Sequence, residues 1–158
     1  MCVRTAYISA YTLNSSSTQN PPLREQLIQE LVGVFFHERY VVHGAQMLDG
    51  YKRPPPIANT GFGDGKPRTP DIVGVDAEKQ RIVFGLVREN RESLDSEDAL
   101  TEYNVLLDHK ADQGDRASVV LVMLPSALVH EFTGIVTHYI HREYWHRIVP
   151  VASTQALG

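Results

Sequence analysis

The sequence predicts an α/β domain in which a mixed β-sheet is flanked by helices. Residues 69–89 contain two short apolar runs, 72–75 and 82–87, joined by a charged turn, a pattern typical of an antiparallel hairpin. Helical and strand-like segments alternate after this hairpin, as in proteins with parallel strand pairs. We therefore expect the order α, β, loop, β-hairpin, α, β, α, β.

Composition limits the classes of function. The chain has 158 residues, 42% hydrophobic and 22% charged, which suits one soluble globular domain. A formal charge of −4 excludes a general polyanion binder, so any nucleic-acid contact has to be local. The single cysteine, Cys2, excludes an internal disulfide and a cysteine-rich zinc site, and it fits the cytoplasm. No signal peptide is visible, and no apolar run reaches the ~20 residues of a membrane span.

The chain divides into three parts. Residues 1–22 form an N-terminal segment and linker, because a Ser/Thr/Asn cluster there closes on two prolines. Residues 23–152 form a single domain, and residues 153–158 form a tail.

The first half of the domain contains a helix, a strand and a long loop. Apolar residues recur at helical spacing over residues 23–37, and residues 39–48 suit a first strand. Residues 49–68 contain three successive prolines and four glycines, which cannot run inside a helix or a central strand. A loop of this length is usually functional or disordered.

A second helix is expected over residues 93–111. Asp95 or Ser96 is suited to cap its amino end. Residues 95–115 contain seven acids, and Lys110 alone opposes them in the helix body, so we expect this face to point away from nucleic acid.

The last third of the sequence predicts a strand, a helix and an edge strand. The apolar run 117–124 is typical of a strand buried on both faces. An amphipathic helix is expected over residues 127–144. Residues 147–152 suit an edge strand, because Pro150 cannot serve a central ladder.

Pro70 and Asp71 open the second strand, and with this order of elements the chain resembles the PD-(D/E)xK nuclease superfamily over roughly residues 23–151. The resemblance implies a restriction-endonuclease-like α-β-β-β-α-β core, here with an additional C-terminal helix and strand. It also implies that the aspartate and an acid of the third strand bind Mg²⁺ or Mn²⁺, with a lysine two residues further on. Carboxylate oxygens suit such ions, which activate water and neutralise charge on a phosphodiester.

The resemblance assigns Asp71 as the family aspartate but departs from the family in the third strand. Leu86 stands at the acid position and Arg88 at the lysine position. Leucine cannot bind a metal, and arginine can contact a phosphate but cannot act as a general base near neutral pH. A register that used Glu89 instead would turn the site to the opposite face of the strand.

The resemblance also implies that a glutamate from the first helix can complete the site. Glu25 is the natural candidate, with Glu30 and Glu38 behind it. We thus expect Asp71 and Glu25 as weak metal ligands and Arg88 as a phosphate contact.

These residues lead to two hypotheses. The first is a nuclease-fold protein related to metal-dependent phosphodiester hydrolysis in DNA processing or defence, with weak or lost catalysis and DNA as its partner. The second is a non-catalytic interaction or assembly module with the same fold, acting as a homodimer or with a protein partner. The negative net charge favours the second hypothesis somewhat.

The long loop offers contacts for a nucleic-acid backbone. Its segment 51–68 carries four cations and a single acid, Asp64. The four are Lys52, Arg53, Lys66 and Arg68. The glycine-rich run 61–66 is not a Walker phosphate loop, because it precedes a strand and lacks the required flanking residues.

Histidines and aromatic residues gather near the end of the last helix. His138 and His141 are three residues apart and could share a metal, but no third ligand is implied, and a solvated helix face is the better interpretation. Tyr139, Tyr144 and Trp145 could stack on bases, although their spacing favours the core or an interface.

Overall fold

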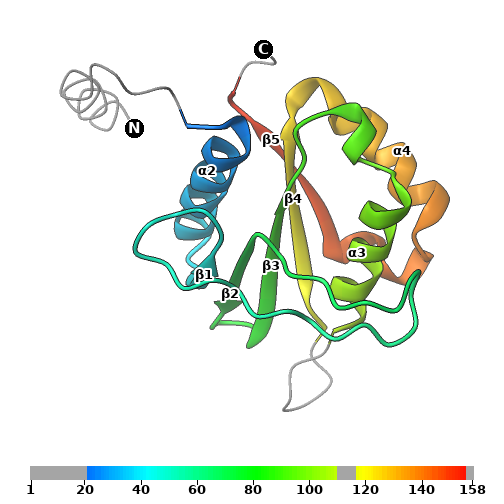
Figure 1. Ribbon diagram of the computed structural model, residues 1–158, viewed down its shortest axis with the longest axis horizontal. Helices are drawn as coiled ribbons and strands as arrows, with labels where there is room; N and C mark the ends of the chain where they lie inside the picture. Colours follow the sequence, from blue (N-terminus) through cyan, green and yellow to red (C-terminus); the bar gives the residue numbers. More distant parts are fainter. Residues whose placement is uncertain (1–20, 110–116, 156–158) are drawn as a thin grey trace.

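One five-stranded sheet lies between two helical layers in the computed structural model, which describes residues 21–109 and 117–155 (Figure 1). The strands follow one another in chain order across the sheet: β1 (Val41–Ala45), β2 (Ile72–Asp76), β3 (Arg81–Val87), β4 (Val119–Pro125) and β5 (Ile148–Ser153). β1, β2 and β3 pair antiparallel, whereas β3, β4 and β5 pair parallel. The expectation of a mixed α/β sheet is confirmed.

Helix α2 (Leu23–His37) covers one face of the sheet, and α3 (Glu97–Asp108) and α4 (Val129–Tyr139) cover the other (Figure 1). Two apolar clusters result, because successive residues of a strand point to opposite faces. In β3, Val83 and Val87 join the cluster under α2, whereas Phe84 and Leu86 join the cluster under α3 and α4.

Two glycines let α2 lie close against β2 and β3. A Cβ atom on Gly85 would stand 2.9 Å from Leu31 Cδ2, and one on Gly74 would stand 3.0 Å from the Phe35 ring and 2.6 Å from a backbone oxygen. Any larger residue would push the helix away from the sheet. The residue range expected for this helix is confirmed.

The first strand is shorter than the expected range 39–48. A bulge interrupts the β1–β2 pairing between Val42 and Gly44. The Ala45 N–H then donates to the Lys52 carbonyl at 2.9 Å, and Met47 adopts a left-handed φ of 67°, so the chain turns away from the sheet.

Helix α3 begins four residues later than expected. Ser96 caps it, its side chain accepting a hydrogen bond from the Ala99 N–H at 3.1 Å. Residues 91–93 form a separate 3₁₀ turn. The helix ends at Asp108, and the last two residues of the expected range lie outside the described residues.

The prediction of one continuous last helix over residues 127–144 is wrong. A 3₁₀ turn precedes α4, and α4 stops at Tyr139, because Ile140 adopts an extended conformation (φ −99°, ψ 139°). A 3₁₀ helix, η3 (Arg142–Arg147), follows and is capped by the His141 ring, which accepts a hydrogen bond from the Glu143 N–H at 3.3 Å. The buried Ile140 side chain anchors the corner between the two.

The last strand joins the first helix. β5 occupies an edge of the sheet and contains Pro150, as expected. The Glu30 carboxylate of α2 accepts hydrogen bonds from Ser153 Oγ at 2.7 Å and from the Thr154 N–H at 2.8 Å. This carboxylate clasp brings residues more than a hundred positions apart into contact.

The long loop before β2 has a defined conformation. Ile57 and Arg68 pair as an antiparallel bridge, and the Asn59 amide bonds to backbone groups of Phe62 and Lys66. The expected loop is therefore confirmed in position, with its fold set by internal hydrogen bonds. None of the helices built from the described residues is long and apolar enough to span a bilayer.

Candidate functional site

The candidate site lies where β2 begins and β3 ends. Asp71 immediately precedes β2, whose first residue, Ile72, pairs with Gly85 of β3. The Asp71 N–H donates to the Gly85 carbonyl at 3.0 Å, and the Val87 N–H donates to Asp71 Oδ2 at 2.9 Å. The carboxylate of the Pro-Asp pair is thus fixed against the backbone of the third strand.

The α2 residue that reaches this carboxylate is Arg24. Its guanidinium forms an ion pair with Asp71 Oδ1, and a second nitrogen lies 4.0 Å from Glu89 Oε1. The sequence predicted its neighbour Glu25 at this place, whereas the α2 side chain that contacts Asp71 is that of Arg24. Adjacent residues of a helix point about 100° apart, so the side chains of Arg24 and Glu25 leave α2 in different directions.

Asp71 is nearly inaccessible, with 1% of its surface exposed. Burial raises the pKa of its carboxyl to about 6, while Arg24 and the Val87 N–H act in the opposite direction. A cation beside a buried acid is the signal that could have identified Arg24, because a buried charge requires a partner.

The two departures from the family motif belong to the core under α3. Leu86 is fully buried there. Arg88 donates to Glu102 Oε1 at 2.5 Å and to the Tyr103 hydroxyl at 3.0 Å, and its guanidinium lies 5.0 Å from the Tyr103 ring centroid. The Tyr103 hydroxyl in turn donates to the Leu94 carbonyl at 2.8 Å.

Arg88 therefore remains a cation held inside the protein. Burial lowers the pKa of Arg88, but Tyr103 and Glu102 more than offset burial and raise it above its usual range. Burial also raises the pKa of Tyr103. Since the guanidinium is engaged by α3 and 7% of the residue is exposed, its expected phosphate contact would require these bonds to break.

The residues present do not fit a magnesium ion. Mg²⁺ takes several oxygen ligands in octahedral geometry. Both oxygens of Asp71 already accept hydrogen bonds, and Leu86 supplies no oxygen. Over residues 21–109 and 117–155, no three histidine, cysteine or acidic side chains are grouped so that they could hold an ion.

The other two candidate glutamates, Glu30 and Glu38, lie away from Asp71. Glu30 is engaged in the carboxylate clasp with β5. Glu38 is the exposed C-cap residue, about 20 Å along the helix axis from Glu25.

Three of the four loop cations are exposed to solvent. Lys52, Arg53 and Lys66 form no ion pair among the described residues. Arg68 is largely buried and bonds Asp64 at 3.1 Å and Asp98 at 2.9 Å. The structure thus assigns Arg68 to holding the loop on α3, whereas the other three are accessible.

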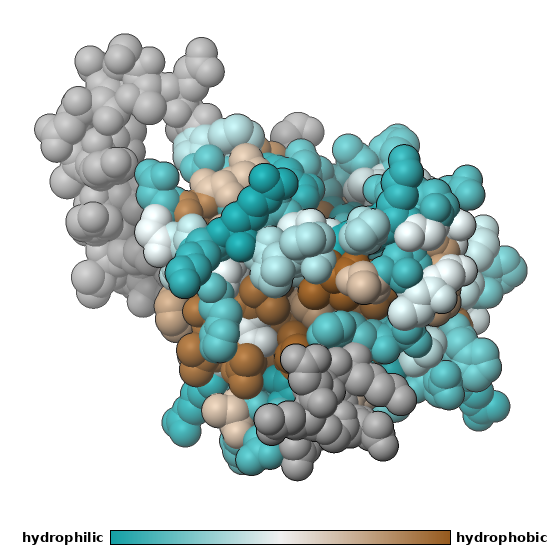
Figure 2. Space-filling view, turned by 60° about the horizontal axis from the view of Figure 1, so that its bottom comes forward, coloured by the Kyte–Doolittle hydropathy of each residue, from teal (hydrophilic) through white to brown (hydrophobic). Residues whose placement is uncertain are grey.

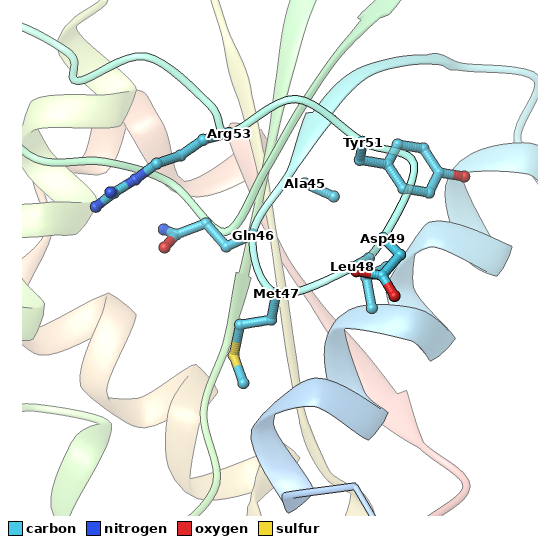
Figure 3. Close-up of a pocket in the computed structure, with 7 residues that line it drawn as sticks. All are labelled: Ala45, Gln46, Met47, Leu48, Asp49, Tyr51 and Arg53. Atoms are coloured by element: carbon cyan, nitrogen blue, oxygen red, sulfur yellow. The ribbon is translucent and has the colours of Figure 1, made fainter.

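An open pocket of about 510 Å³ adjoins the site. It is lined by residues 45–49, Tyr51 and Arg53, and Figure 3 shows Arg53 and Gln46 extending to one side of the loop while Tyr51 and Asp49 lie on the other. Gln46 links the pocket to the site, because its N–H donates to the Asp71 carbonyl at 2.8 Å and its amide to the Pro70 carbonyl at 2.9 Å.

The histidines, Tyr139 and Trp145 at the end of α4 and in η3 lie on the surface, whereas Tyr144 is half-buried and packs against the core. His138 and His141 are exposed, in agreement with a solvated face. Tyr139 is 51% exposed and Trp145 38% exposed, so these two rings are not core residues.

Comparisons with family models, with curated proteins and with solved structures find no match to this chain. The contacts of Asp71 are therefore the basis for proposing a function.

Proposed function

We propose that this chain is a restriction-endonuclease-like protein, related to metal-dependent nucleases of DNA processing or defence, whose catalysis has been lost. The order of α2, three antiparallel strands, α3 and a parallel β4 supports this proposal, because the resemblance to PD-(D/E)xK nucleases implies that order. The position of Asp71 beside the third strand supports it as well.

The ion pair of Arg24 with Asp71 is the observation that carries the loss of catalysis. Hydrolysis of this type needs an ion that activates water and neutralises charge on the phosphodiester. A guanidinium on Asp71 supplies positive charge but cannot activate water. Leu86 adds no ligand, and Arg88 is engaged by Glu102.

The direct test is a cleavage assay. Plasmid, single-stranded DNA and RNA are incubated with the protein and Mg²⁺ or Mn²⁺, beside the Asp71→Ala variant. We expect no cleavage by either protein and no heat of Mn²⁺ binding in calorimetry. Cleavage by the natural chain that disappears in Asp71→Ala would refute the proposal.

A gain-of-binding variant tests whether Arg24 occupies the place of a metal. Arg24→Glu replaces the cation by a carboxylate next to Asp71, with Glu89 close by. We expect the melting temperature of this variant to rise when Mn²⁺ is added, because the ion relieves repulsion between the acids. Arg39→Glu, an exposed site beyond the other end of α2, is the control and should show no Mn²⁺ effect. Equal responses of the two variants would contradict the assignment.

Assembly is a second candidate function, favoured by an apolar strip across the sheet. Val41, Val75 and Ile82 are cross-strand neighbours on the face opposite α2, and Val41 is 52% exposed. Figure 2 shows apolar side chains gathered on the side where the β2–β3 turn lies. Such a strip suits a second copy or a protein partner.

Sedimentation velocity separates the assembly function from a monomeric one. We expect the natural chain to self-associate and Val41→Lys to remain monomeric, whereas Val149→Lys on β5 should behave as the natural chain does. A monomeric natural chain at all concentrations would exclude the homodimer.

A further inference from the structure

The segment 138–147 forms an unusual surface that the Asp71 site does not use. Eight of its ten side chains are planar, namely His138, Tyr139, His141, Arg142, Tyr144, Trp145, His146 and Arg147. Of the other two, Ile140 is buried and Glu143 is the single acid. We name these ten residues the planar surface. It belongs to the side of the sheet that carries α3 and α4, away from α2 and Arg24.

Two rings of the planar surface, those of Trp145 and Tyr144, are held by contacts within the fold. Trp145 Nε1 donates to the Ile140 carbonyl at 2.9 Å. Arg147 lies 4.9 Å from the Tyr144 ring centroid and donates to the Ser118 carbonyl at 2.8 Å. Exposed rings that are fixed in this way lose little freedom when a ligand stacks on them.

The chemistry of the planar surface favours a partner with flat faces that can stack. No aliphatic side chain is exposed within it, so a ligand there would meet mainly rings and guanidinium planes. Arg142 is exposed and forms no ion pair within the part of the chain that the structure describes. Aromatic, imidazole and guanidinium planes are the groups on which unpaired bases stack, with cations nearby for phosphates.

We propose that the planar surface binds single-stranded nucleic acid, with bases stacked on Tyr139 and Trp145 and a phosphate on Arg142. A duplex is excluded from this mode, because its bases are already stacked on one another. The binding is independent of the Asp71 site and holds whether or not the chain hydrolyses phosphodiesters.

Fluorescence provides a direct test, because Trp145 is the chain's single tryptophan. Oligothymidylate is titrated into the full chain at low salt, beside the same strand paired with oligoadenylate. We expect saturable quenching by the single strand alone, and weaker binding as salt is added. No saturable quenching at low salt, or equal binding of the duplex, would overturn the proposal.

Variants localise the binding, with anisotropy of a labelled oligothymidylate as the readout. Tyr139→Ala and Arg142→Glu should each weaken binding by roughly tenfold, and Trp145→Phe should retain most of it because a ring remains. Phe36→Ala removes a ring from α2 that is at least as exposed as Tyr139, and it should leave the affinity unchanged. Circular dichroism of each variant verifies that it is folded. A loss of affinity in Phe36→Ala equal to that in Tyr139→Ala would assign the binding to another surface.

Discussion

At the scale of single residues, the two charged groups nearest the motif positions are structural. Asp71 is buried and paired with Arg24, and Arg88 is buried and paired with Glu102. A buried ion pair costs desolvation that its attraction only partly offsets, so its main effect appears when one partner is removed. Each pair therefore makes a prediction about stability rather than about catalysis.

Asp71 should make the protein less stable as the pH rises. Its pKa is about 6 in the folded chain, compared with about 4 for an unfolded aspartate. Between these values the folded state binds more protons, so the stabilisation is complete below about pH 4 and is lost as the pH rises through 6. Urea unfolding of the natural chain and Asp71→Asn at several pH values tests this. As the pH rises from below 4 to above 6, the free energy of unfolding of Asp71→Asn should increase by about 1–3 kcal/mol relative to that of the natural chain. A pH-independent difference would contradict the prediction.

Removal of Glu102 should leave the Arg88 cation without its acid. We expect Glu102→Gln to lower the free energy of unfolding by about 2–4 kcal/mol. Glu97→Gln, at the exposed first residue of α3, should change it by less than about 1 kcal/mol. The double variant Arg88→Met/Glu102→Gln should recover part of the loss, because no buried charge is then left unpaired. Equal stabilities of Glu102→Gln and Glu97→Gln would show that the pair is unimportant.

At the scale of elements, the long loop is fitted to α3 at one glycine. Gly63 and Gly65 both adopt positive φ, 52° and 75°. A Cβ atom on Gly63 would overlap Thr101 Oγ1, whereas one on Gly65 would meet open space. The contact of Gly63 with Thr101 and the ion pair of Arg68 with Asp98 together hold the loop against the first half of α3.

The two glycines form a matched pair of substitutions. Gly65→Ala should cost about 1 kcal/mol for the unfavourable φ alone. Gly63→Ala should lower the free energy of unfolding by about 2–4 kcal/mol, because the clash with Thr101 adds to the same unfavourable φ. Chemical denaturation measures both, and equal costs would mean that the loop does not press on the helix.

The ends of elements show what the sequence could not reveal. Periodicity located α2 correctly, but it extended the last helix through Tyr144, because the apolar spacing continues past Ile140. The break depends on Ile140 entering the core and on the His141 cap, and both are tertiary effects. Likewise, β1 ends at Ala45, because Met47 adopts a left-handed conformation that turns the chain away from the sheet.

At the scale of the whole molecule, the mixed sheet was predictable and the site was only partly so. Alternation of polar and apolar segments determines the order of elements, and the parallel pairs follow from their helical crossovers. The position of Asp71 follows from the hairpin. Which α2 residue meets it depends on the rotation of the helix over Gly74 and Gly85, which no local pattern encodes.

The carboxylate clasp of Glu30 indicates where the chain could be joined and cut to make a circular permutant. Because Glu30 meets Ser153 and Thr154, the first helix and the last strand lie side by side. Joining residue 155 to residue 21 and cutting the exposed β2–β3 turn would give a circular permutant with the same sheet. In the natural chain β2 and β3 are close in sequence. In the permutant they would lie at opposite ends of the chain, so their pairing would become its longest-range contact and the permutant should fold more slowly. The ratio of the two folding rates would then report whether this hairpin forms before the fold's rate-limiting step.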